Sequence, residues 1–140
     1  YINIPDTGGR DSLFQAEARR CKEILDTLNT ERHFCIFDEL FSGTNPYEAI
    51  ASAYGYLTYL QKYNINIMLT THFIQLCKYL DKNKYYKNYH MEANYSNNTL
   101  LYSYKIKNKI SNIKGGVEVL RQLQYPDIII QKTKNIINKL

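Results

Sequence analysis

The sequence lacks the features that mark several large classes of protein. No apolar run among its 140 residues approaches the roughly 20 that a helix needs to span a bilayer, so no membrane partner is expected. Neither a signal peptide nor an internal repeat is visible. The first residue is Tyr1 rather than Met, which leads us to expect a fragment of a longer protein.

Cysteine and histidine are both scarce. The cysteines, Cys21, Cys35 and Cys77, are an odd number and lie within apolar patterns, so they predict buried free thiols rather than a disulfide framework. Free thiols indicate an intracellular, reducing compartment, which the sequence does not narrow to nucleus, cytoplasm, viral factory or organelle. The three histidines show no metal-ligand spacing with the cysteines, so a zinc site is not expected.

What the sequence does have is positive charge and enough apolar residues for a core. Hydrophobic residues make up 44%, which suits one domain or part of one. The formal net charge of +5 would suit a nucleic-acid partner. However, Ile, Asn, Lys and Tyr, whose codons are AT-rich, account for 57 of the 140 residues, so genome composition is a sufficient cause. The charge therefore does not indicate DNA binding.

The most informative run is HFCIFDELFSGTNPYEAI, residues 33–50. Its apolar segment predicts a buried strand over 33–38 that delivers two adjacent acids, Asp38 and Glu39. Carboxylates at the carboxyl end of a parallel strand lie where α/β sheets bind ligands. In nucleotide hydrolases one such carboxylate holds Mg²⁺, and a second orients or polarises the attacking water. The run by itself leaves open a simpler alternative, an acidic strand end that only faces solvent.

Helical and strand patterns alternate around this run. Ser12 and Gln15 have the spacing of a capping box, and Asn45 with Pro46 fits an N-cap followed by Pro at the first helical position. The predicted elements, in order, are a strand end at 1–4, a helix from 12 to about 29, a strand over 33–38, a helix from 46 to about 62, a strand from 65 to about 70 and a short helix over 74–80. This order predicts a parallel, three-layer α/β core.

The second half of the chain changes character. Residues 85–95 and 99–106 are rich in tyrosine with partial alternation, and they predict a β-hairpin. Two helices follow, the second opened by Pro126. The second helix has many apolar positions for a lone surface helix, so it either packs on the core or contacts a partner. The change of character predicts two parts, 1–114 and 115–140.

Four segments now occur in a recognisable order. They are GRDSLFQAEARRCKEIL, CIFDELFSGTNPYEAI, LTTHFIQLC and the tail GGVEVLRQLQYPDIIIQKTKNII. Together they resemble the ATPase domain of the MutS family of DNA mismatch-repair proteins. The first resembles that family's signature loop, S-x-F-x-x-E, the second its Walker B strand, the third its T-H switch and the tail its terminal helix-turn-helix. The residues that carry the resemblance are Ser12, Phe14, Glu17, Asp38, Glu39, Gly43, Thr44, Thr71 and His72.

The resemblance implies a P-loop NTPase-like, three-layer sandwich. It implies a parent protein that couples the binding and hydrolysis of ATP, with Mg²⁺, to the binding of mismatched or branched DNA. A second MutS-like ATPase subunit, identical or paralogous, would be its partner, and the helix-turn-helix at 115–140 would be the element that dimerises. Asp38 would hold Mg²⁺, and Glu39 and His72 would be catalytic. The implied nucleotide contacts are Asp38, Gly43, Thr44, Thr71 and Ser12, of which the last would reach the nucleotide of the opposite subunit.

The sequence also departs from the family pattern. It has no G-x-x-x-x-G-K-[ST] phosphate loop, which in the family precedes the region where this chain begins. We therefore expect the isolated chain not to hydrolyse ATP. Arg10 and Asp11 before the serine, and EARRC in the helix that follows, indicate a divergent branch. The AT-biased composition would suit a viral or organellar source.

Simpler roles and other functions remain open at this point. Ser12 could only cap its helix, His72 could be a hydrogen-bonded structural residue, and Glu17 could only support the loop. One alternative function is the head domain of another ABC-type DNA recombination or maintenance ATPase, although the L-S-G-G-type signature of such heads is missing. The other is a non-catalytic module that dimerises through its terminal helices.

Overall fold

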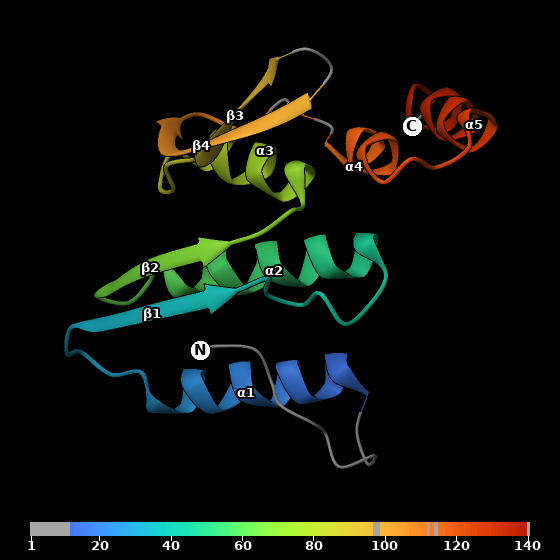
Figure 1. Cartoon of the computed structure of the whole chain (residues 1–140). Helices are drawn as coiled ribbons and strands as arrows, with labels where there is room; N and C mark the ends of the chain where they lie inside the picture. The colour runs from blue at the N-terminus through green and yellow to red at the C-terminus, as the bar shows by residue number, and fades with distance from the viewer. Residues whose placement is uncertain (1–11, 97–98, 112, 114, 140) are drawn as a thin grey trace. The chain divides into compact units, whose positions relative to one another are not determined.

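The structure, a computed structural model, describes residues 12–96, 99–111, 113 and 115–139 (Figure 1). The chain forms two compact units, Tyr1–Lys87 and Asn88–Leu140. This division groups the hairpin with the terminal helices, and the functional boundary expected after residue 114 stays a prediction. The strand end expected at residues 1–4 lies outside the described residues.

Helix and strand alternate along the described part of the first unit. The elements are α1 (Leu13–Thr27), β1 (His33–Asp38), α2 (Pro46–Leu60), β2 (Ile65–Thr70) and α3 (Ile74–Asn83). Each matches a predicted element, and both predicted helix starts are confirmed. The Ser12 hydroxyl accepts a hydrogen bond from the Gln15 amide, and the Gln15 side chain accepts one from the Ser12 amide. The Asn45 side chain caps α2 in the same way, ahead of Pro46.

The two strands form a parallel sheet that is covered on one face. Asp38 pairs in register with Thr70 at the carboxyl ends of β1 and β2. Because successive strand residues point to opposite faces, Phe37 is fully buried while Phe34 and Met68 are 65% and 57% exposed. The described residues therefore form two layers, the sheet and helices on one side of it. The mixed α/β class is confirmed, whereas the third layer of the predicted sandwich is not among the described residues.

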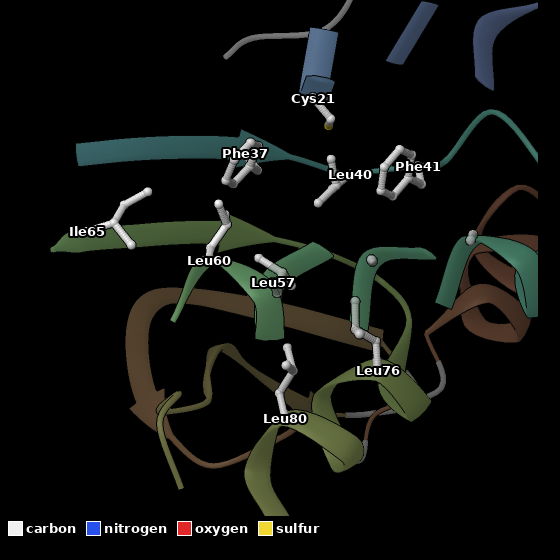
Figure 2. Close-up of a cluster of buried hydrophobic side chains, with 11 residues drawn as sticks. Cys21, Phe37, Leu40, Phe41, Leu57, Leu60, Ile65, Leu76 and Leu80 are labelled. Carbon is white, nitrogen blue, oxygen red and sulfur yellow. The ribbon is translucent and has the colours of Figure 1, made fainter. Parts of the chain in front are cut away.

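The core of the first unit is one cluster of buried side chains, drawn in Figure 2. Its members come from all five elements and from the loop after β1, and they are Cys21, Phe37, Leu40, Phe41, Ala49, Ala53, Leu57, Leu60, Ile65, Leu76 and Leu80. Removing this apolar surface from water is the main stabilising contribution. A hydrogen bond from the Tyr56 hydroxyl to the Cys21 carbonyl oxygen, 3.1 Å long, also joins α2 to α1.

The cysteines are free, as predicted, but only one of them is fully buried. Cys21 is 3% exposed, whereas Cys35 and Cys77 are half-buried. Burial raises the pKa of Cys21 to about 12, which keeps this thiol protonated and unreactive at neutral pH. The expectation of buried thiols is therefore wrong for Cys35 and Cys77; Cys35 packs against the outside of the cluster rather than inside it.

The second unit contains the predicted hairpin and the two predicted terminal helices. Its elements are β3 (Tyr89–Ser96), β4 (Thr99–Asn108), α4 (Gly116–Gln122) and α5 (Asp127–Ile137). The strands pair antiparallel, with a register shift between Met91 and Ala93. Val117 of α4 and Ile130 of α5 are buried. No helix in the part of the chain that the structure describes is both long and apolar enough to cross a membrane.

Candidate active site

The carboxyl ends of the parallel strands place Asp38 at one edge of the sheet. Asp38 ends β1 beside Thr70, which ends β2, and the Thr70 hydroxyl donates a hydrogen bond to Asp38 Oδ1. This bond restrains the rotation of the carboxylate, as a metal ligand or catalytic group requires. Thr70 is not among the site residues predicted from the sequence. The signal that could have identified it is the pair of adjacent threonines, Thr70 and Thr71, at the end of the predicted strand.

Glu39 and His72 lie next to each other just beyond the strands. The Glu39 amide donates to the Thr70 carbonyl oxygen at 3.0 Å, so Glu39 stays anchored to β2. His72 Nδ1 lies 3.4 Å from Glu39 Oε1, and the two side chains are 60% and 53% exposed. An exposed pair of this kind contributes little to the stability of the fold, so stability is not the reason why Glu39 and His72 lie together. The structure thus brings together the two predicted catalytic side chains and leaves both open to a ligand.

Thr71 and His72 form the connection from β2 to α3. The Thr71 hydroxyl accepts a hydrogen bond from the Phe73 amide at 3.1 Å, which closes a local turn. The His72 ring packs on the ring of Phe73, with centroids 4.3 Å apart. The His72 side chain is therefore held by local contacts and is still 60% exposed.

Ser12 lies at the N-terminus of α1, where its hydroxyl completes the capping box. The position is exposed. The amides of a helix N-terminus and the helix dipole favour an anion there, so the capping role and a phosphate contact are compatible.

The loop after β1 packs closely against the first turns of α1. The Gly43 amide donates a hydrogen bond of 3.2 Å to Glu17 Oε2, and the rings of Phe14 and Phe41 lie 5.5 Å apart. The Thr44 hydroxyl instead donates to Glu48 Oε2 at 2.8 Å, within the first turn of α2. The predicted site residues therefore form two groups, one at the strand ends and one where the loop meets α1.

Glu17 is the one charged residue that the structure buries among those it describes, at 4% exposure. Burial raises the pKa of its carboxyl group, and the backbone amides of Gly43, Phe41 and Ser42 partly oppose this by favouring the ionised form. The Glu17 carboxylate thus supports the loop by facing its backbone amides.

The donor set at the strand ends fits one kind of metal site. In the described residues no three His, Cys, Asp or Glu side chains gather closely enough to hold a metal by themselves. Mg²⁺, however, usually keeps several waters and is bound by one or two carboxylates together with substrate phosphates. Asp38, restrained by Thr70 and exposed at the sheet edge, suits that arrangement.

A methyl group at Gly43 would have no room. A Cβ atom there would lie 2.6 Å from Leu13 Cγ and 2.8 Å from the backbone nitrogen of Phe14, which cannot move without the helix. We expect Gly43→Ala to lower the free energy of unfolding by about 1–3 kcal/mol, measured by urea denaturation. Gly55→Ala is the matched control, because no atom lies within 4 Å of its added Cβ. An unchanged stability of Gly43→Ala would contradict the close approach of the loop to α1.

Comparisons with known proteins identify the family of the chain. Residues 6–140 match the family described as MutS domain V. The chain is 28% identical to the DNA mismatch repair protein MutS of Aquifex pyrophilus, over 95% of this chain and 16% of that protein. It is 27% identical to the protein of the same name from Prochlorococcus marinus (strain MIT 9312), over 98% of this chain and 15% of that protein.

A third relative, the DNA mismatch repair protein MutS of Bacillus subtilis (strain 168), is 25% identical over 95% of this chain and 16% of that protein. The chain thus spans about one-sixth of the length of the curated relatives it matches. The resemblance inferred from the signature loop, the acid pair and the T-H switch is confirmed. Because the match covers nearly the whole sequence, the chain belongs to the MutS domain V family.

Proposed function

We propose that the chain is the carboxyl-terminal part of the ATPase domain of a MutS-like mismatch-repair protein. In that protein, ATP binding and hydrolysis are coupled to the binding of mismatched or branched DNA by regions outside this chain. The observation that carries the proposal is the grouping of Asp38, Glu39 and His72 at the carboxyl ends of two adjacent parallel strands. Ligands bind at this edge in α/β sheets, and acids there serve phosphoryl transfer.

Each residue at the strand ends has a distinct proposed role. Asp38 holds Mg²⁺, which when bound neutralises charge on the phosphates. Glu39 orients the attacking water and accepts its proton, and His72, in contact with Glu39, helps to place that water near the terminal phosphate. Thr71 contributes to the nucleotide site through the turn that positions His72.

The second group of residues serves the boundary between two subunits. Ser12, at the positive end of α1, contacts the phosphates of the nucleotide bound by the opposite subunit. Gly43 and Thr44 form the loop beside that contact. This arrangement requires a second MutS-like ATPase subunit.

Exposed apolar residues support the terminal helices, residues 115–140, as the element that pairs the subunits. Leu123, which caps the end of α4, is 66% exposed. Ile128 and Ile136 of α5 are 62% and 55% exposed. Apolar side chains gathered on terminal helices are typical of a surface that another chain covers. The same residues would serve a non-catalytic dimerisation module, which remains the second candidate function.

The test of the proposal is the Mg²⁺ dependence of ATP turnover in the natural polypeptide that carries this chain. Asparagine at position 38 can still accept the Thr70 hydrogen bond but is a weaker ligand for Mg²⁺. We expect Asp38→Asn to raise the Mg²⁺ concentration for half-maximal turnover by at least about tenfold, since even outer partners of metal ligands are worth about 10–100-fold in affinity.

Asp26→Asn, in an exposed ion pair with Lys22 on α1, is the control and should leave the Mg²⁺ dependence unchanged. An unaltered Mg²⁺ requirement in Asp38→Asn would remove this residue as the ligand. The 140 residues alone contain no phosphate loop and should show no turnover.

A further inference from the structure

We propose that Glu17 is a positioning residue, whose buried carboxylate holds the loop after β1 against α1 and so keeps Glu39 and Ser12 in one fixed relation. This inference rests on the proposed function, because it concerns residues assigned there to hydrolysis and to the partner's nucleotide. Glu17 itself touches neither the nucleotide nor the water.

The loop that Glu17 contacts has an unusual backbone. Glu39 and Phe41 have φ values of 50° and 61°, in the left-handed backbone region that residues other than glycine rarely adopt. Such residues persist only where the surrounding structure determines them, and they occur often at functional sites. Hydrogen bonding of Glu39 to Thr70 fixes one end of the loop, and the bond from the Gly43 amide to Glu17 fixes the other.

The position of Glu17 explains why its contact with Gly43 links the N-terminus of α1 to the loop after β1. It lies in α1 one turn beyond the capping box of Ser12, so it moves with the helix N-terminus. Its partner Gly43 lies four residues beyond Glu39, and an added Cβ at Gly43 would lie 2.6 Å from Leu13 Cγ, so the loop packs tightly on the start of α1. A displacement at the helix start is therefore transmitted to the catalytic loop, and a displacement of the loop to the helix start.

The loop amides of Gly43, Phe41 and Ser42 compensate the burial of the Glu17 carboxylate. Burying a carboxyl group among apolar side chains is unfavourable unless hydrogen bonds compensate. Apolar neighbours Leu40 and Phe41 already anchor the loop in the core, at 1% and 5% exposure. Apolar contacts are non-directional and do not fix the orientation of the loop. The Glu17 oxygen does fix it, because it accepts a hydrogen bond from one specific amide, that of Gly43.

The experiment compares Glu17→Gln with wild type in the natural polypeptide that carries this chain, by steady-state ATP turnover and by amide hydrogen exchange. Glutamine keeps the size of the side chain but loses the charge that strengthens the hydrogen bonds. We expect exchange in peptides covering 41–43 to become at least about tenfold faster. We expect kcat to fall by about 10–100-fold with KM for ATP changed less than about twofold, because a misplaced catalytic group affects the transition state.

Two further variants make the result decisive. Glu23→Gln, an exposed acid of the same helix paired with Arg20, should leave both measurements unchanged. Glu17→Asp keeps the charge but withdraws the carboxylate from Gly43 by one methylene, so it should also speed exchange at 41–43. This variant replaces Glu17→Gln in the experiment if Glu17→Gln does not fold.

Unchanged exchange at 41–43, or exchange raised equally along α1 and β1 with an unchanged kcat, would overturn the assignment, since the second pattern is that of a merely structural residue. Absence of ATP turnover in wild type would instead defeat the proposed function, and the exchange measurement would still decide whether Glu17 holds the loop.

Discussion

Replacing Glu39 with glutamine is expected to lower kcat for ATP hydrolysis by about 10²–10⁴-fold, the range for loss of a positioned proton acceptor. Glutamine has nearly the same shape and keeps the backbone hydrogen bond to Thr70, so the loop is preserved. It cannot accept a proton from the attacking water. Since nucleotide and Mg²⁺ would still bind, KM for ATP should change little. Single-turnover and steady-state hydrolysis by the natural polypeptide measure the effect.

The matched control for this variant is Glu31→Gln. Glu31 is an exposed acid in the loop before β1, and its backbone amide donates a hydrogen bond to the Asn29 side chain. It should retain full turnover. If Glu39→Gln also retained full turnover, Glu39 would be the solvent-facing acid that the sequence left as an alternative, and catalysis would have to be reassigned.

The parts of the fold that could be predicted are those that short stretches of sequence determine by themselves. The bounds of β1 and β2 follow from short apolar runs, and the starts of α1 and α2 follow from Ser12 and from Asn45 with Pro46, because caps act within a few residues. The apolar run of β1, however, predicted burial on both faces, and Phe34 is 65% exposed. A run of apolar residues does not say which neighbours cover it, since that depends on segments distant in sequence.

The candidate site also has a part that could be predicted from local sequence and a part that depends on tertiary packing. Asp38 could be located because it ends a predictable strand, and the T-H pair because it ends the next one. The contact of Glu39 with His72 depends on parallel pairing across 33 residues and on a left-handed backbone at a non-glycine position. Neither follows from local propensity. The bond between Gly43 and Glu17 joins residues 26 apart and is likewise a result of tertiary packing.

The second large effect concerns the side chain directly before the acid pair. Phe37 is fully buried in β1, and its ring meets that of Tyr56 edge-on, with centroids 5.8 Å apart. We expect Phe37→Ala to lower the free energy of unfolding by about 3–5 kcal/mol, because it removes apolar contacts and leaves a cavity between the sheet and α2. Urea denaturation followed by circular dichroism measures the loss.

Phe34→Ala is a matched control in the same strand, with the same change of side chain on the opposite face. Its exposed ring should be worth no more than about 0.5 kcal/mol, as for other surface substitutions. The difference between the two variants thus measures the one-sided burial of the sheet. Equal and large losses would show that the face of Phe34 is covered as well. The acid pair would then end a strand enclosed on both sides, as in the three-layer sandwich that the sequence predicted.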